Sequence, residues 1–181
     1  MFDLGPAAAE MRRLVSEVRD DQLDCPTPCS DWTVADLLAH VHQLATVFTL
    51  NARKEQARPP EALVDDWREA IPGQLDDLAA AWRQASAWQG RVSAGGVEMD
   101  AADNAVVGIE ELTVHGWDVA RATGQDLRID DARLDQVDRF FALFGEEPFG
   151  PAARVPEGAT RLEQTVASTG RDPSWRQCVD A

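Results

Sequence analysis

The sequence is short of several residue types that many enzymes and membrane proteins use. Tyrosine is absent, which removes one common acid/base candidate, and Lys54 is the only lysine among 181 residues. No apolar run approaches the roughly 18 residues that a membrane-spanning helix requires. The first residues, MFDLGPAAAEMRR, lack the basic-then-apolar layout of a signal peptide. We therefore expect a soluble, cytoplasmic protein without a membrane partner.

Positive charge and cysteine are also scarce. The chain has 17 basic against 32 acidic residues, a net charge of −15. This charge disfavours nucleic acid and anionic membrane as partners, because their binding depends on Lys and Arg contacts to phosphate. Cys25, Cys29 and Cys178 do not have the paired CxxC spacing of structural zinc sites. Cys25 and Cys29 could form a redox pair, but we favour buried or incidental thiols.

Hydrophobic periodicity predicts a chain made mainly of helices. Capping patterns and Gly or Pro breaks place them at about residues 3–24, from Thr33 to before Pro59, and at about residues 74–88, 102–124, 131–145 and 158–168. Thr33 and Asp36 form a capping-box pattern. The segment QGRVSAGGVEMDA, which Gly95-Gly96 divides, is either a small hairpin near residues 90–100 or a loop.

This pattern predicts an all-α fold. Four or five long helices with short connections are typical of a helical bundle. We expect a four-helix bundle with an extra short helix near the C-terminus. The length suits a single domain that covers residues 1–181. Bundles build metal and ligand sites from side chains on facing helices, so the few histidines become the candidates for such a site.

The helix at residues 102–124 carries one candidate half of a metal site. Glu111, His115 and Asp118 line up along one edge of its apolar face. Residues four apart in a helix have Cβ atoms about 5–6 Å apart, so their side chains can converge on one ion. Gly108 and Gly116 lie nearby and would let another helix approach closely. The spacing is also that of an ordinary solvated pair, so it permits a metal site without requiring one.

The other two histidines, His40 and His42, lie on the second predicted helix. They flank its apolar stripe on opposite edges, so only one can face a site shared with the helix at residues 102–124. Periodicity does not select between them, and both could be boundary residues with polar tips in water. A glycine-rich phosphate loop, a GxSxG elbow and an HExxH motif are absent from the sequence.

Either histidine would complete a three-ligand set with Glu111 and His115. Catalytic zinc sites commonly use three protein ligands and leave a fourth position open for water or substrate. Asp36 or Asp118 could orient one of these ligands by a hydrogen bond without binding the metal itself. Of these two, Asp36 is better placed to cap its helix, as the capping-box pattern indicates.

Two segments and the C-terminal end resemble a known family. TPCSDWTVADLLAHV, residues 27–41, is similar to the second-helix signature of the actinobacterial branch of the DinB-like, mycothiol-dependent maleylpyruvate isomerase family. EELTVHGWDVARATG, residues 110–124, resembles the partner signature on a later helix of that family. FFALFG, FGPAARVP and TGRDPSW resemble the end of a short, single-domain subgroup. The resemblance spans nearly the whole chain.

The resemblance implies a DinB-like four-helix bundle with a divalent metal held between helices. Its ligands on this sequence are His40, Glu111 and His115, so it favours His40 over His42. In the isomerase that names the family, the metal activates the thiol of mycothiol. The thiol adds to a cis double bond, and rotation and elimination then release the trans product. That isomerase has an added C-terminal domain, which we do not expect in this shorter chain.

We therefore expect a metal-dependent thiol transferase or isomerase with a mycothiol-like cosubstrate and a small electrophilic substrate. Zinc is the expected ion, although nickel could occupy the same ligands. The electrophile would bind among the first, second and fourth helices, beside Trp32 and Trp117 unless both are core residues. The alternative is a non-catalytic bundle whose metal site is closed by His42 or Asp118, or one without metal. The oligomeric state stays open, a homodimer included.

Overall fold

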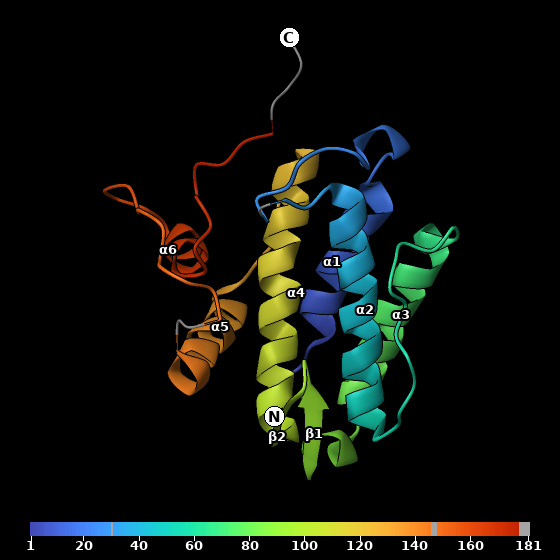
Figure 1. Cartoon of the computed structure of the whole chain (residues 1–181). Coiled ribbons are helices and arrows are strands. Elements are labelled where there is room, and N and C mark those ends of the chain that lie inside the picture. Colours follow the sequence, from blue (N-terminus) through green and yellow to red (C-terminus); the bar gives the residue numbers. More distant parts are fainter. Residues whose placement is uncertain (30, 146–147, 178–181) are drawn as a thin grey trace.

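The computed structural model describes residues 1–29, 31–145 and 148–177 (Figure 1). Its elements are α1 (Gly5–Glu17), the 3₁₀ turn η1 (Asp20–Gln22), α2 (Val34–Arg53), α3 (Trp67–Trp82), the 3₁₀ turn η2 (Ala85–Trp88), β1 (Arg91–Ala94), β2 (Val97–Asp100), α4 (Ala101–Thr123), α5 (Asp131–Phe144) and α6 (Arg161–Ser168). The fold is mostly helical, but its two-stranded sheet means that it is not purely all-α. Across the described ranges, no helix is both long and apolar enough to cross a membrane.

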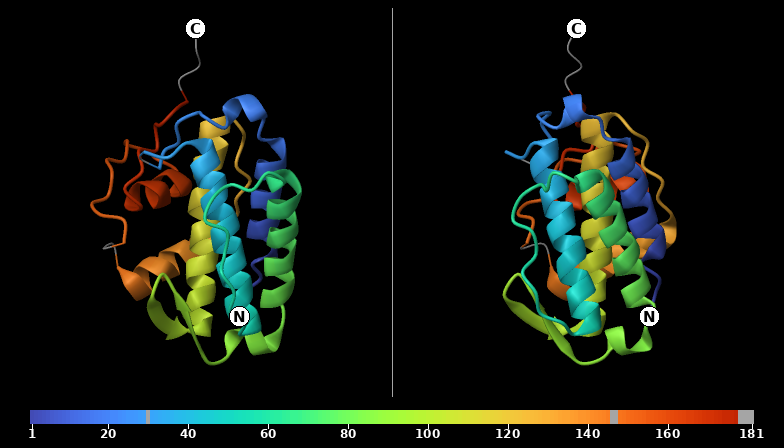
Figure 2. Two further views of the ribbon diagram at one scale, coloured as in Figure 1. Left: turned by 45° about the vertical axis from the view of Figure 1, so that its right-hand side comes forward. Right: turned by 90° about the vertical axis from the view of Figure 1, so that its right-hand side faces the viewer.

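The bundle consists of α1, α2, α3 and α4, which run side by side (Figure 2). Each of α1 and α2 packs against both α3 and α4. The side chains buried between them are almost all apolar, and burial of such surface is the dominant favourable contribution to folding. They include Leu4, Met11, Leu14, Leu37, Leu38, Phe48, Ile71, Leu75, Leu78, Trp82, Ala105 and Ile109. This core holds α2 against α4, the two helices that carry the three histidines.

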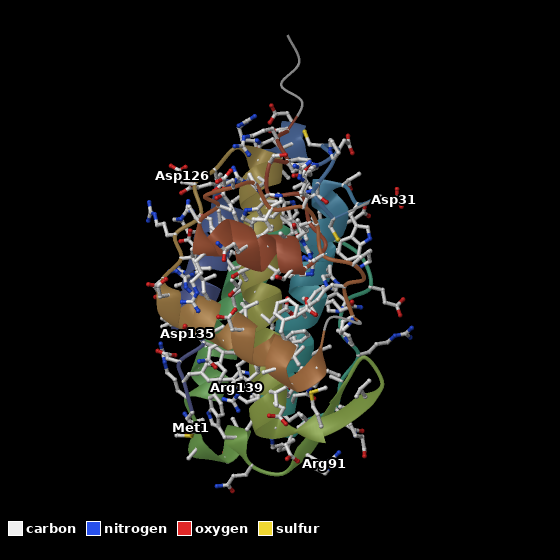
Figure 3. The ribbon with its side chains drawn as sticks, turned by 90° about the vertical axis from the view of Figure 1, so that its left-hand side faces the viewer. Met1, Asp31, Arg91, Asp126, Asp135 and Arg139 are labelled. Atoms are coloured by element: carbon white, nitrogen blue, oxygen red, sulfur yellow. The ribbon has the colours of Figure 1, made fainter. Side chains whose placement is uncertain are left out.

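The helices α5 and α6 lie outside the bundle. α5 packs against α4, and α6 packs against α5. Figure 3 shows both helices crossing in front of α4. The residues of α5 that are buried are Leu134, Val137 and Phe140. After α6 the chain returns to α4, where Arg171 contacts Asp118. The C-terminal part of the chain therefore covers a face of α4 beside the bundle.

The predicted end of the first helix is wrong. Helix α1 ends at Glu17 rather than near residue 24, and η1 follows it. Gln22 makes bonds there that a continued helix would not allow. Its side-chain amide donates to the Thr123 carbonyl at 3.0 Å, and its Oε1 accepts from the Arg19 N–H at 3.0 Å. A contact with α4 therefore outweighs the local helical pattern.

The predicted bounds of the third helix are also wrong. Helix α3 spans Trp67–Trp82 rather than residues 74–88, and Pro72 lies inside it. A proline in a helix interior costs about 3 kcal/mol, but the core residues Ile71 and Leu75, which lie on either side of Pro72, are both fully buried. At the other end, Trp88 Nε1 donates to the Trp82 carbonyl at 2.8 Å, so the 3₁₀ turn η2 replaces the expected last turn.

Other features agree with the sequence prediction. Asp36 N–H donates to Thr33 Oγ1 at 3.2 Å, and Thr33 N–H donates to Asp36 Oδ2 at 2.9 Å, which completes the capping box of α2. The segment near residues 90–100 is a hairpin, since β1 pairs antiparallel with β2. Gly95 and Gly96 turn it with φ of 57° and 81°, the positive values that tight hairpin turns require. Gly124, with φ 71°, ends α4.

Candidate metal centre

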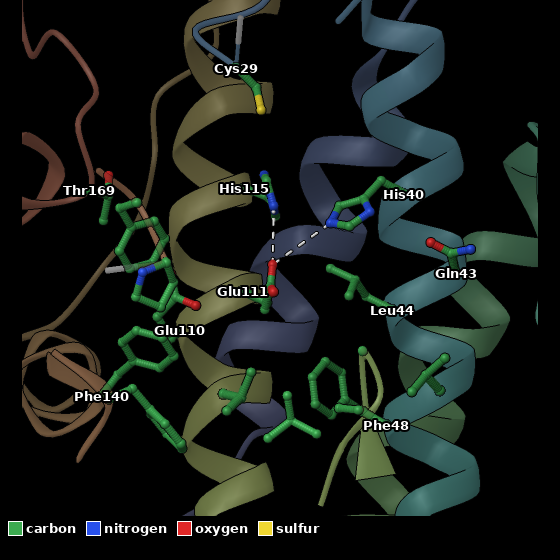
Figure 4. A pocket seen from close by; sticks show the side chains of 18 of the residues that line it. Cys29, His40, Gln43, Leu44, Phe48, Glu110, Glu111, His115, Phe140 and Thr169 are labelled. Atoms are coloured by element: carbon green, nitrogen blue, oxygen red, sulfur yellow. Dashed lines mark ion pairs between the residues drawn. The ribbon is translucent and has the colours of Figure 1, made fainter. Parts of the chain in front are cut away.

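The three predicted ligands meet between α2 and α4 (Figure 4). His40 Nε2 lies 3.8 Å from Glu111 Oε2, and His115 Nε2 lies 3.1 Å from the same oxygen. One donor atom from each residue lies within 4.8 Å of the other two. The side chain of His40 is 24% exposed and that of Glu111 is 26% exposed, whereas His115 is largely buried. The cluster therefore lies at the edge of the core, where a small ligand can reach it.

The spacing of the cluster fits a divalent ion. Ligand atoms that bind zinc tetrahedrally at about 2.0–2.2 Å lie roughly 3.3–3.6 Å from one another. The two distances to Glu111 Oε2 fall on either side of this range. Two imidazoles and one carboxylate also make up a ligand set that catalytic zinc sites use with an open position. Small side-chain movements are therefore enough for these residues to hold an ion.

In the metal-free cluster, neighbouring groups stabilise the charged forms of Glu111 and His115. Burial by itself would raise the pKa of Glu111, but contacts with His115 and His40 lower that pKa to about 2. Burial would likewise lower the pKa of His115, but Asp118 and Glu111 raise it to about 9. At neutral pH the metal-free cluster therefore holds an ionised Glu111 and a protonated His115. An ion that binds through His115 has to displace this proton.

A buried ion pair lies behind His115. Its Nδ1 donates to Asp118 Oδ2 at 2.9 Å. Asp118 is fully buried, and it accepts at 2.8 Å from both Nε and Nη2 of Arg171. Burial would raise the pKa of Asp118, but His115 and Arg171 keep it lowered. A partner of this kind fixes the ring orientation of a metal-binding histidine, and here it directs Nε2 of His115 toward Glu111. Asp36 is engaged in the cap of α2 instead.

Sequence reasoning missed Arg171. This residue lies 53 positions after Asp118, in a stretch without regular secondary structure. The segment that contains it, TGRDPSW, was noted only because it resembles the end of a subgroup of the family. The available signal was Asp118 itself, because an acidic residue at the edge of an apolar helix face is rarely buried without a cationic partner. That signal does not indicate which arginine supplies the charge.

His42 does not belong to the cluster. It is buried, its pKa is lowered by burial, and its Nδ1 has no hydrogen-bond partner among the residues that the structure describes. His42 is also absent from the lining of the cavity beside the cluster, whereas His40 contributes to it. The structure thus brings His40, and not His42, to Glu111 and His115.

Cys29 is a neighbour of the cluster that sequence reasoning did not place there. Its Sγ lies within 4.8 Å of donor atoms on His115 and Asp118. Two hydrogen bonds to the Cys29 carbonyl hold its loop, one from Thr27 Oγ1 at 2.9 Å and one from Trp32 N–H at 3.1 Å. Burial raises the pKa of the Cys29 thiol, and the charge of Asp118 raises it further. The side chain therefore remains a thiol at neutral pH.

Cys25 and Cys29 are both free in the structure. Gln177 Nε2 donates to Cys25 Sγ at 3.2 Å, so this sulfur has a partner other than a second cysteine. The third cysteine, Cys178, lies outside the described residues.

A cavity of about 850 Å³ opens beside the cluster. Its walls come from α2, the hairpin, α4, α5 and the loop residues 28–29, 59, 148–149 and 169–171, and not from α1, which was expected to contribute. Most lining side chains are apolar, and they include Leu44, Val47, Phe48, Val97, Met99, Val107, Phe140, Phe144 and Phe149. Glu110 also lines it, and burial together with the charge of Glu111 raises the pKa of Glu110 well above its usual value.

The two tryptophans predicted near the site have different positions. Trp32 contacts His40, with 4.8 Å between the ring centroids, but it lines a separate hollow of about 460 Å³, to which His40 also contributes. Trp117 is buried on α4 but is not part of the bundle core, and the Arg121 guanidinium lies over its ring. Trp117 is therefore a packing residue, and Trp32 alone borders the metal centre.

Comparisons with known proteins match most of the chain. The family model described as "Mycothiol maleylpyruvate isomerase N-terminal domain" matches residues 4–120, which include His40, Glu111 and His115. Two proteins of Mycobacterium tuberculosis, one from each of two strains, are both described as uncharacterised. Each is 27% identical to this chain over 176 residues, which cover 87% of this chain and 90% of the relative.

Two solved structures share the fold. The crystal structure of a mycothiol-dependent maleylpyruvate isomerase superposes with a TM-score of 0.58 at 21% identity, and that of a mutant of this isomerase superposes with a TM-score of 0.55 at 20% identity. Each match covers 74% of this chain but only 65% of the isomerase chain. At such low identity the likeness shows a common fold.

Proposed function

Because the chain belongs to the family of the mycothiol maleylpyruvate isomerase N-terminal domain, we propose that it is a metal-dependent thiol transferase or isomerase. Its cosubstrate would be mycothiol or a similar low-molecular-weight thiol, and its second substrate a small electrophile. The observation that carries this proposal is the cluster of His40, Glu111 and His115 beside a cavity of about 850 Å³. An ion bound there would lower the pKa of a thiol in its open coordination position and so supply a nucleophile near neutral pH.

The chain's own residues would hold and shield that centre. His40 and His115 would bind through Nε2, and Glu111 through Oε2, because these atoms already face one another. Asp118 accepts a hydrogen bond from Nδ1–H of His115, which leaves Nε2 free as a ligand. Arg171 balances the charge of the buried Asp118. The apolar cavity walls would exclude water from the reacting atoms, which strengthens electrostatic interactions there.

Transfer and isomerisation share their first step. A thiolate sulfur, whose proton has already passed to solvent, forms a bond to an electrophilic carbon as a π bond of that carbon opens or a leaving group departs with its electron pair. In a transfer the sulfur stays on that carbon. In an isomerisation it leaves again after rotation about the former double bond, and the double bond re-forms. We propose zinc as the ion because a set of two histidines and one glutamate suits it, and nickel fits the same ligands.

A non-catalytic structural site is the second candidate. Cys29 favours it, since its Sγ lies close to donor atoms of His115 and Asp118 and thiolates are common ligands of structural zinc. The two residues that the sequence suggested for closing the site are differently engaged. His42 lies away from the cluster, and both oxygens of Asp118 accept from Arg171.

Elemental analysis of the purified protein tests the metal centre. We expect near-stoichiometric metal in the wild type, most of it lost in His40→Ala and His115→Ala. His42→Ala is the matched control, because it removes a buried histidine from the same helix and should keep the metal. Circular dichroism checks that each variant folds. Wild-type protein that holds no metal after reloading with zinc or nickel would contradict the proposal.

An assay of mycothiol consumption then separates the two candidates. The zinc-loaded wild type should consume the thiol in the presence of an electrophile, and His115→Ala should not. A metal-loaded protein without an exchangeable ligand on the ion would instead support the structural candidate.

A further inference from the structure

We propose that the electrophile is an uncharged, largely apolar molecule with an aromatic or similarly flat group, and not a small anion. This inference rests on the proposed function, because it assigns the substrate class of the same site. The cavity beside the metal centre carries it. Its volume of about 850 Å³ is that of a site for a drug-sized molecule.

The walls of the cavity are rich in aromatic rings. Phe48 comes from α2, and Phe140 and Phe144 come from α5. The Phe140 ring centroid lies 5.0 Å from that of Phe144 and 5.5 Å from that of Phe149, so these three rings form one continuous surface. In Figure 4, Phe48 and Phe140 lie on opposite sides of the space next to Glu111. A flat apolar group that enters the cavity would bury apolar surface against these rings.

The charges around the cavity disfavour an anion. Among the described residues that line it, Arg171 is the only arginine or lysine. Its Nε and Nη2 both donate to Asp118 at 2.8 Å, so this charge is already paired. Glu110 and Glu111 add two carboxyl side chains to the lining. An anionic substrate group away from the metal ligands would therefore be buried without a cationic partner, which is costly.

The hairpin gives the cavity an exposed apolar edge. Val97 begins β2 and pairs with Ala94 across the turn, and both residues line the cavity with Met99. Val97 is 59% exposed, so it extends the apolar lining out to solvent. A substitution at Val97 can therefore change the charge at the cavity mouth without disturbing the core.

Two dyes of one skeleton test the preference directly. Phenylnaphthylamine is uncharged, anilinonaphthalenesulfonate is its sulfonated counterpart, and both fluoresce when they enter apolar sites. Titrations of the zinc-loaded and the metal-free protein should show at least about tenfold tighter binding of the uncharged dye. Val97→Lys should narrow this ratio by several fold, because the ammonium can pair with the sulfonate. Val155→Lys is the matched control, since Val155 is an exposed valine outside the cavity and its substitution should leave the ratio unchanged.

Turnover provides a second readout. Chlorodinitrobenzene and chlorodinitrobenzoate are activated aromatic electrophiles that differ in a carboxylate. With either one, a carbon–sulfur bond forms, the carbon–chlorine bond breaks, chloride leaves and the thiol proton passes to solvent. We expect kcat/KM with mycothiol to be higher for the uncharged compound in the wild type, and the ratio to fall in Val97→Lys.

The outcomes separate this inference from the proposed function. If the sulfonated dye binds as tightly as the uncharged one, or if the two lysine variants behave alike, the substrate class is wrong even when the protein holds its metal. If no metal binds but the uncharged dye still binds, and Val97→Lys narrows its preference, the apolar binding site is supported and the proposed thiol chemistry is wrong.

Discussion

Removal of the Arg171 side chain should destabilise the metal-free protein, although this residue lies outside the bundle helices. Asp118 is fully buried and accepts two hydrogen bonds of 2.8 Å from Arg171. Arg171→Met keeps much of the side-chain volume and removes the charge. Removal of one partner from a buried ion pair costs about 3–5 kcal/mol. His115 still pairs with Asp118 at 2.9 Å, which favours the lower end of that range.

Urea and thermal unfolding measure this cost. For a domain of this size, 1 kcal/mol shifts Tm by roughly 2–4 °C, so Arg171→Met should lower Tm by about 6–12 °C. The double variant Asp118→Asn/Arg171→Met should recover part of the loss, because it leaves no unpaired carboxylate in the interior. Arg58→Met is the control, since Arg58 pairs with Glu61 at the exposed surface and such pairs contribute at most about 1 kcal/mol. A loss in Arg171→Met no larger than in Arg58→Met would refute the reasoning.

Two further predictions concern the ion itself. The pKa of His115 is raised to about 9 in the metal-free protein and that of Glu111 is lowered to about 2, so zinc binding at pH 7 should release about one proton. The affinity for zinc should then rise about tenfold per pH unit up to pH 9 and level off above it. Calorimetry in buffers of different ionisation enthalpy measures the proton release, and no release at pH 7 would contradict the prediction. Cys29→Ser should keep the metal, because the Sγ of Cys29 does not lie within 4.8 Å of donor atoms on both His40 and Glu111. In the cobalt-loaded wild type we expect no thiolate-to-cobalt absorption band, and a band that disappears in Cys29→Ser would show that Cys29 closes the site.

Most of the helical architecture could be predicted from local sequence. The Thr33 cap and the glycine that ends α4 act through bonds within a few residues, so their effect is visible in the chain itself. The hairpin was one of two alternatives, and the positive φ of Gly95 and Gly96 decided it. The wrong boundaries of the first and third helices occur where distant or buried contacts compete with the local pattern. Gln22 of η1 bonds to the Thr123 carbonyl of α4, and Trp67 is buried in the core.

The ligands on α4 could be predicted from the sequence more fully than the ligand on α2 or the cavity wall from α5. Glu111 and His115 follow from helix geometry, which places residues four apart next to each other. The choice of His40 over His42 came from the family resemblance, and the structure places His40 at 3.8 Å from Glu111. The apolar wall from α5 was not foreseen, because nothing in the spacing of α5 shows which face of the bundle it covers.

By itself, the sequence determined the helices and the pair of donors one turn apart on α4, because both depend on interactions within a few residues. Only the tertiary structure decided that Arg171, 53 positions later, pairs with Asp118 and thereby orients His115. Only the tertiary structure decided that Cys29 lies beside the ligands and that α5 completes the cavity. These contacts join segments far apart in the chain, and they form because buried charge needs a partner and apolar faces need cover, requirements that no local spacing encodes.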